Sequence, residues 1–312
     1  MVNPMNDTLT KHAHTGLLGE AAALRWLAEA ESSGGLRVAH VISATDTELI
    51  EERIATSNPM RTMARTAGAA LARTHAAGAL SWGVAPDGWQ GDYIIGHSYT
   101  PTVGHVKVPE ISVSPLETIA SLETMRSSEI TETPVTLETT DAAETTAMPP
   151  QSWGAFWSRY RIGAYLKQLP PGFFSEAELA LFGQLCQSLE AGELDAPQPA
   201  LVREQGHEVA RVHGDLWAGN LLWSSESPTG AVLIDPMAHG GHAEEDLAML
   251  TLFGCSYLDE FIEGYESVSP LAAGWRSRVS LMQLAPLLHH CVLFGQSYKN
   301  QTLVALRKYV PR

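Results

Sequence analysis

Polar residues suited to phosphoryl transfer lie close together in the segment His213–Asn220 (HGDLWAGN). Transfer of a phosphoryl group to a hydroxyl needs a carboxylate that orients the hydroxyl and accepts its proton, oxygen ligands for Mg²⁺, and positive charge near the phosphates. Asp215 follows a short strand predicted over Val209–His213, so its carboxylate can stand in an exposed loop as the base. Asn220 lies five residues further on, where a tight loop can turn its amide oxygen toward the same place.

A predicted hairpin brings a second carboxylate to this loop. Asn220–Trp223 and Ala231–Ile234 are apolar, and a turn-forming run lies between them. The second strand ends at Asp235-Pro236, so we expect Asp235 to return beside Asn220. An amide oxygen and a carboxylate are hard oxygen ligands that suit Mg²⁺. The spacing therefore indicates phosphoryl transfer with Asp215 as base and with Asn220 and Asp235 as metal ligands.

Two other interpretations of this region stay open. The 213–220 segment by itself could be a structural turn in which Asp215 caps the next segment, although Asp235 at hairpin distance argues against this. His239 and His242 could instead bind zinc, as in a metal hydrolase. A pair of histidines without further ligands is more often structural, so phosphoryl transfer remains the favoured interpretation.

Helices and a few short strands must position these residues. Helix-forming patterns extend over Gly19–Ala30, Pro59–His75, Trp153–Leu169, Glu176–Ala191 and most of the chain after Glu244. Ser175 is expected to cap the fourth of these helices. Further strands are predicted over Arg37–Ser43 and Thr47–Ile54. This order, a small sheet-bearing N-terminal part followed by helices around one hairpin, predicts an α+β fold.

The composition argues against several classes of partner. The chain has 35 acidic and 20 basic residues, a net charge of -15 that repels nucleic acid and anionic lipid. No apolar run approaches the ~20 residues that span a bilayer, and the N-terminus lacks the apolar stretch of a signal peptide. Three separated cysteines, Cys186, Cys255 and Cys291, do not make a disulfide framework. We therefore expect a cytoplasmic protein without nucleic-acid or membrane partners.

The stretch at about 101–151 differs from its surroundings. It contains no Trp, Tyr or Phe and is rich in Thr, Glu and Ser. Such a segment buries too little apolar surface to offset the entropy of ordering it, so we expect a flexible insertion.

Three blocks of the C-terminal half resemble the fructosamine (ketosamine) kinase family. HGDLWAGN, with Trp217, is similar to the family's HGDLWSGN. The run Asp235–Gly254 resembles the family's IDPA, YYGHRE, DLAM and LFGG sequences, and Pro270–Gly295 is similar as well. The resemblance implies a two-lobed protein-kinase-like fold, shared with aminoglycoside phosphotransferases. A small sheet-based N-terminal lobe would precede a larger, mainly helical C-terminal lobe.

The same resemblance implies roles for residues of the N-terminal lobe. Kinases of this fold hold ATP phosphates with a strand lysine paired to a helix glutamate. Lys11 and Glu20 match these positions, although Glu20 could instead only favour the helix dipole. Glu51, Glu52 and Arg53 fall at the hinge, whose backbone would bind adenine. Only ten residues precede Lys11, and the chain contains no GxGxxG or Walker A sequence, so this lobe is expected to be shortened.

These observations predict an ATP-binding lobe over 1–55 and a helical catalytic lobe over 56–312. The resemblance implies transfer of the ATP γ-phosphoryl, with Mg²⁺, to a hydroxyl on carbon 3 of the sugar of a ketosamine, a sugar attached to an amine. Trp217, His213 and Asp246 are candidate substrate contacts, although Trp217 could instead pack the loop against the C-terminal helices, and anchoring of the loop is the favoured role for Asp246. Alternatives are a kinase for another small molecule, such as an aminoglycoside or amino alcohol, and a catalytically silent relative that binds a partner through the acidic insertion.

Overall fold

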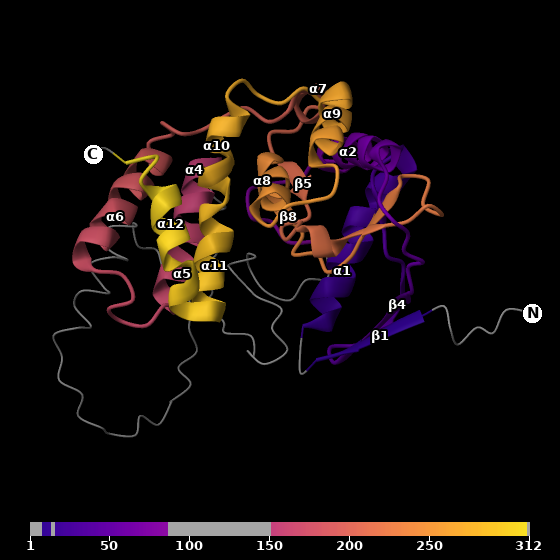
Figure 1. Cartoon of the computed structure of the whole chain (residues 1–312), viewed down its shortest axis with the longest axis horizontal. Helices are drawn as coiled ribbons and strands as arrows, with labels where there is room; N and C mark the ends of the chain where they lie inside the picture. The colour runs from indigo at the N-terminus through magenta and orange to yellow at the C-terminus, as the bar shows by residue number, and fades with distance from the viewer. Residues whose placement is uncertain (1–7, 14–15, 87–150, 311–312) are drawn as a thin grey trace, which may run out of the picture.

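The structure, a computed structural model, describes residues 8–13, 16–86 and 151–310 of the chain. Helices dominate these residues, and small sheets lie mainly toward one end of the molecule (Figure 1). The predicted insertion at about 101–151 lies outside the described residues, apart from Gln151. No described helix is long and apolar enough to cross a membrane.

An antiparallel sheet of order β1-β4-β3 forms the N-terminal end of the fold. Its strands are β1 (Thr8–His12), β3 (Val41–Ala44) and β4 (Glu48–Glu52). The helix α1 (Leu17–Ala28) contacts β3 and β4 and continues into the 3₁₀ turn η1 (Glu29–Ser33). Lys11 pairs with Leu49 in the register, so Lys11 and Glu51 are diagonal neighbours on one face of the sheet.

The predicted strand Arg37–Ser43 is wrong as a single element, because the chain changes sheets at its centre. Its first part, β2 (Arg37–Val38), pairs in parallel with β7 (Ala231–Leu233), and β7 pairs antiparallel with β6 (Leu221–Trp223). Ala39 N–H donates to the Leu233 carbonyl, whereas the carbonyl of the next residue, His40, accepts from Glu52 N–H. The local pattern of apolar residues cannot show that adjacent residues hydrogen-bond to different sheets. The predicted hairpin is confirmed as β6 and β7.

Helices α2 (Arg61–Ala76) and α9 (Leu258–Val268) pack closely across the centre of the molecule. A Cβ built on Gly68 would lie 1.9 Å from the Phe261 carbonyl oxygen, and one on Gly264 would lie 2.0 Å from the Arg65 carbonyl oxygen. The two helix backbones can therefore approach this closely only because these positions are glycine. Next to this pair lie α8 (Glu244–Leu252) and the short antiparallel sheet of β5 (Ala210–Val212) and β8 (His239–Gly241).

A second group of helices lies at the opposite end from β1 (Figure 1). The group comprises α4 (Trp153–Phe156), the π-helical segment η2 (Trp157–Ile162), α5 (Gly163–Gln168), α6 (Glu176–Glu190), α10 (Trp275–Met282), α11 (Leu284–Phe294), the 3₁₀ turn η4 (Gly295–Tyr298) and α12 (Lys299–Leu306). Ser175 and Glu178 form the capping box of α6, which confirms the predicted cap. Two shorter helices, α7 (Ala200–Glu204) and the 3₁₀ turn η3 (Ala218–Asn220), complete the fold.

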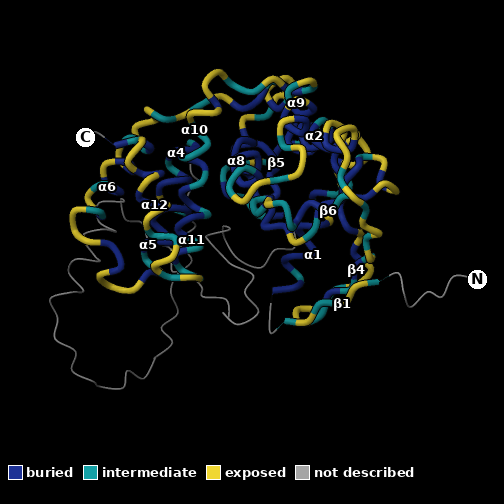
Figure 2. The backbone as a smooth tube through the Cα atoms, in the orientation of Figure 1, coloured by how far each residue is buried: buried dark blue, intermediate teal, exposed yellow. Residues whose placement is uncertain are grey.

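Buried residues surround α8 and β5 and also line α1, α2 and the inner sides of the helices at the opposite end (Figure 2). One apolar cluster joins residues of α1, α2, β7 and α9, and a second joins the helices at the opposite end. The first cluster therefore continues across residue 55, and the division into 1–55 and 56–312 stays a prediction. The α+β class with small sheets and a larger helical part is confirmed.

Candidate active site

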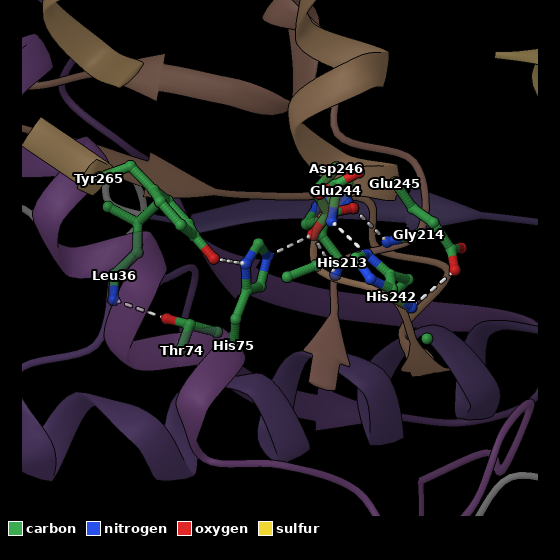
Figure 3. A network of polar contacts seen from close by, with 12 residues as sticks. Leu36, Thr74, His75, His213, Gly214, His242, Glu244, Glu245, Asp246 and Tyr265 are labelled. Atoms are coloured by element: carbon green, nitrogen blue, oxygen red, sulfur yellow. Dashed lines mark hydrogen bonds and ion pairs between the residues drawn. The ribbon is translucent and has the colours of Figure 1, made fainter. Parts of the chain in front are cut away.

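The loop after β5 is held by a buried carboxylate from α8. Asp246 accepts the backbone N–H groups of His213 and Gly214 at 2.7 and 2.9 Å (Figure 3). Gly214 has φ +81°, and a Cβ there would lie 2.2 Å from the Met237 carbonyl oxygen. A side chain at this position would therefore push the loop away from Asp246.

Asp246 is itself fixed by a histidine from α2. His75 Nε2 lies 3.0 Å from Asp246 Oδ2, and His75 Nδ1 lies 2.8 Å from the Tyr265 hydroxyl on α9 (Figure 3). Sequence reasoning missed His75, and its one available signal was a histidine in the last turn of an alanine-rich helix. The chain of contacts joins α2, α8 and α9 to the catalytic loop.

The contacts of His213 and Asp246 hold the loop, as the anchoring role for Asp246 predicts, and substrate contact by either residue stays a prediction. Both side chains are buried, and neither has a face left open to solvent. His213 Nε2 lies 2.9 Å from the Ile234 carbonyl, and its Nδ1 accepts the N–H of Asp215 at 3.2 Å. Their side-chain polar atoms are thus used to shape the loop.

Asn220 joins the predicted base to the predicted metal-binding aspartate. Its Nδ2 donates to the Asp215 carbonyl at 2.9 Å and to Asp215 Oδ2 at 3.2 Å, with a longer contact of 3.4 Å to the Asp235 carbonyl. Burial raises the pKa of Asp215 to about 7, while the Asn220 hydrogen bond and the positive charge of Arg161 oppose that rise. A carboxylate with this pKa is suited to accept a proton near neutral pH.

Asp235 lies just after β7 and points to the N-terminal sheet. Its φ of +52° is a left-handed conformation that is rare for a residue other than glycine, and such conformations cluster at functional sites. Asp235 Oδ1 forms an ion pair with Lys11. The structure therefore brings Asp215, Asn220, Asp235 and Lys11 together, although 224 positions separate the last two in the sequence.

Three carboxylates surround the ammonium of Lys11. Its Nζ lies 2.7 Å from Glu20 Oε1 and 3.0 Å from Glu51 Oε1, in addition to its contact with Asp235. Burial opposes the charge of Lys11, yet Glu20 and Asp235 raise its pKa above the ordinary value. Burial also raises the pKa of Glu20 to about 7 and raises that of Glu51, in both cases against the effect of Lys11. The predicted Lys11–Glu20 pair thus has an additional member, Glu51.

The three residues predicted to form the hinge, Glu51, Glu52 and Arg53, have different surroundings in the structure. Glu51 and Glu52 belong to β4, and Glu52 pairs with Arg37 at 2.8 Å. Arg53 is exposed immediately after the strand. Sequence reasoning assigned Glu51 a role through its backbone, whereas the structure shows its side chain buried against Lys11. Binding of adenine by the backbone at this point stays a prediction.

Aromatic rings border the loop on the side of the helical group. Trp217 is 42% exposed and lies edge-to-face with Phe253 at 6.5 Å between ring centroids. Phe253 in turn lies 5.1 Å from the ring of His290 on α11. Trp217 therefore has a free surface next to Asp215, as the expected substrate contact requires.

The histidines that suggested zinc are used within the protein. His239 contacts the Met237 carbonyl at 2.8 Å and Glu245 at 3.3 Å through its two ring nitrogens. His242 contacts the Ala196 carbonyl at 3.2 Å and accepts the N–H of Glu244 at 3.2 Å. Across the part of the chain that the structure describes, no group of three or more potential ligands could hold a metal ion by itself. These contacts support a structural role for both histidines.

Comparison with known proteins identifies relatives of this chain. The family model described as fructosamine kinase matches residues 138–312. A Vibrio parahaemolyticus protein assigned as a ketoamine kinase is 32% identical over 169 residues, which are 53% of each chain. The mouse ketosamine-3-kinase is 29% identical over 157 residues, which are 50% of this chain and 47% of that one. The chain thus matches about half the length of these curated relatives.

Solved structures extend the likeness over nearly the whole chain. A Thermobifida fusca protein assigned as a fructosamine-3-kinase has a TM-score of 0.69 and 31% identity, covering 97% of this chain and 85% of that one. A Haemophilus somnus protein with the same assignment has a TM-score of 0.62 at 17% identity, covering 97% and 83%, and shows the shared fold. The predicted kinase-like fold is confirmed. Because the family model matches residues 138–312, more than half of the chain, the chain belongs to the fructosamine kinase family.

Proposed function

We propose that the protein is an ATP-dependent kinase that phosphorylates a sugar hydroxyl of ketosamines of the fructosamine or ribulosamine type. The observation that carries this proposal is the contact of Asn220 with both Asp215 and Asp235. It unites a base and two oxygen ligands in one loop and hairpin. The family of the matching relatives supports the class of acceptor.

The residues around this contact fit Mg²⁺ and the phosphates of ATP. The Asn220 amide nitrogen is turned to Asp215, and among the described residues no hydrogen bond engages its amide oxygen. The Asp235 side chain is about half exposed. These two groups would hold Mg²⁺, and Lys11 would contact phosphate. Mg-ATP, when bound, supplies the transferable phosphoryl group and a cation that offsets its charge.

Asp215 carries the proton transfer in this proposal. Its carboxylate would orient the acceptor hydroxyl and accept the hydroxyl proton. The hydroxyl oxygen would form the new bond to the γ-phosphorus of ATP as the bond from that phosphorus to the bridging oxygen of ADP breaks and ADP leaves. Asn220 holds the carboxylate through Oδ2, and Asp246 holds the loop through two backbone N–H groups. The exposed face of Trp217 offers the sugar an apolar surface beside the base.

The first experiment measures ADP release with Mg-ATP and a panel of fructosyl-, ribulosyl- and erythrulosyl-amines, together with an aminoglycoside and an amino alcohol. Asp215→Asn is expected to fold normally and to lose about 10²- to 10⁴-fold in turnover, since it removes the base. Asp259→Asn is the matched control, because Asp259 is an exposed aspartate on α9 away from the loop.

Each outcome has a distinct meaning. Turnover of a ketosamine that is lost in Asp215→Asn and kept in Asp259→Asn supports both the reaction and the base. Turnover of only the aminoglycoside or the amino alcohol contradicts the acceptor class. Failure to bind Mg-ATP in calorimetry supports a catalytically silent protein, and full activity of Asp215→Asn overturns the role of Asp215.

A further inference from the structure

A buried arginine whose charge acts on Asp215 has no hydrogen-bond or ion-pair partner among the described residues. Arg161 lies on the π-helical segment η2 and is 4% exposed. Its Nε and Nη1 atoms have no hydrogen-bond partner, and no ion pair engages its guanidinium among the residues described. The Trp157 ring, 5.7 Å from the guanidinium carbon, compensates the charge only in part. A buried cation left in this state is costly unless something pairs with it, and π-helical turns often mark functional sites.

The position of Arg161 relates it to the base. Its charge favours the ionised form of Asp215 and so lowers the pKa of that carboxyl, although burial has the larger, opposite effect. The two groups are thus close enough to interact, yet they form no ion pair within 4.0 Å. Lys11, the other cation at the site, is already engaged by three carboxylates. Within the described ranges, Arg161 is therefore a cation without an ion-pair partner whose charge acts on Asp215.

A second buried polar group also has no hydrogen-bond partner in the part of the chain that the structure describes. His289 on α11 stacks on Tyr165 of α5, with 5.2 Å between ring centroids, and its Nε2 is buried without a hydrogen bond in the described part of the chain. Burial, together with the nearby charges of His290 and Arg161, lowers the pKa of His289 to about 3, so its ring is neutral at physiological pH. A neutral ring can still donate one hydrogen bond.

A series of rings connects this region to the catalytic loop. The centroids of His289 and His290 are 5.9 Å apart, His290 and Phe253 are 5.1 Å apart, and Phe253 and Trp217 are 6.5 Å apart. His289 therefore lies at the far end of the aromatic series that begins at Trp217.

We propose that Arg161, assisted by His289, binds an anionic group of the acceptor while the acceptor hydroxyl lies at Asp215. This inference rests on the proposed function and specifies its substrate class. Guanidinium groups bind carboxylates and phosphates through two parallel hydrogen bonds in one plane. In Arg161, the Nε and Nη1 atoms have no partner among the described residues and can make such a pair of bonds. The acceptor class that fits is a ketosamine whose amine part is an amino acid with a free carboxylate. A phosphate on the sugar presents the same chemistry from the other end of the molecule.

The test compares acceptors that differ only in the anion. Fructosyl-glycine carries a carboxylate and fructosyl-glycinamide a neutral amide of nearly the same shape. A third arm compares fructosyl-glycinamide with its sugar-phosphorylated form. With Mg-ATP, kcat/KM of the wild-type protein is expected to be about ten- to a hundredfold higher for the anionic member of one pair, the range of a charged hydrogen bond. The pair that shows the preference identifies the source of the anion.

Two variants assign the preference to a residue. In Arg161→Met, the new side chain keeps a similar length without charge. The ratio of kcat/KM for the anionic acceptor to kcat/KM for the neutral acceptor is therefore expected to fall toward one. Arg159→Met is the matched control, because Arg159 lies on the same segment but is exposed and pairs with Glu190 at 3.0 Å. Calorimetry of fructosyl-glycine binding without ATP gives a readout apart from turnover, and affinity is expected to drop in Arg161→Met alone.

The wild-type comparison needs no variant to fold. Equal kcat/KM within both pairs, with ketosamines still turned over, overturns the role of Arg161 and leaves the proposed function intact. A preference that persists in Arg161→Met also overturns it. Absence of turnover with every ketosamine refutes the proposed function itself.

Discussion

Replacing Asp246 by Asn tests whether a buried carboxylate anchors the catalytic loop. Its Oδ2 accepts from His213 N–H and contacts His75 Nε2, and its Oδ1 accepts from Gly214 N–H. An amide has only one acceptor oxygen. Whichever way it turns, an NH₂ group faces at least one backbone N–H of the loop, and the two donors cannot bond to each other.

The magnitude follows from these contacts. A hydrogen bond to a charged group contributes about 1.5–3 kcal/mol, and a buried donor without an acceptor costs about 1–3 kcal/mol. We therefore expect Asp246→Asn to lower the free energy of unfolding by about 3 kcal/mol, with about 5 kcal/mol as an upper limit. Turnover should fall as well, because the freed N–H groups flank Asp215 directly.

The assay is urea unfolding of the variant and the wild type. Their free energies of unfolding are compared with the same slope of free energy against urea concentration. The control is Glu263→Gln on α9, which alters an exposed pair with Arg65 at 2.7 Å and should change stability by less than about 1 kcal/mol. A loss below about 1 kcal/mol in Asp246→Asn would mean that other contacts hold the loop and that the hydrogen bonds of Asp246 in Figure 3 do not anchor it.

Three further predictions concern packing, pH and nucleotide binding. Gly68→Ala should destabilise the protein by about 3 kcal/mol in urea unfolding, because its Cβ would overlap the backbone of α9; a neutral effect would contradict the close packing. Since burial raises the pKa of Asp215 to about 7 and the base must be ionised, kcat/KM should decline as the pH drops below about 7, with the midpoint displaced downward when Mg²⁺ is bound; a rate that rises on acidification is incompatible with this role. Glu51→Gln removes one of the carboxylates that compete with phosphate for Lys11, so calorimetry should show tighter Mg-ATP binding, and weaker binding would show that Glu51 supports the nucleotide site.

The catalytic loop and hairpin were predictable because their interactions are local. Asp215 and Asn220 are five residues apart, and Asp235 follows the second strand of a hairpin whose turn residues are plain in the sequence. The cap of α6 at Ser175 was predictable for the same reason, since it depends on residues within one helical turn.

Contacts between distant segments were not predictable in this way. The change of sheets at Ala39 and His40 depends on hydrogen bonds to β7 and β4, which no local pattern of apolar residues reports. His75 binds Asp246 from 171 positions away, and the role of a single histidine in a helix cannot be read without knowing what packs on it.

The sequence by itself indicated the family and the residues proposed for the reaction centre, because short-range spacing and chemical type define both. The tertiary structure alone decided which charges are compensated. It placed the Glu51 carboxylate against Lys11 and buried His213 and Asp246 in the contacts that hold the loop. It also left Arg161 without an ion pair among the described residues. Compensation depends on distance and burial, and these arise only when the sheet, the loop and the π-helical segment pack together.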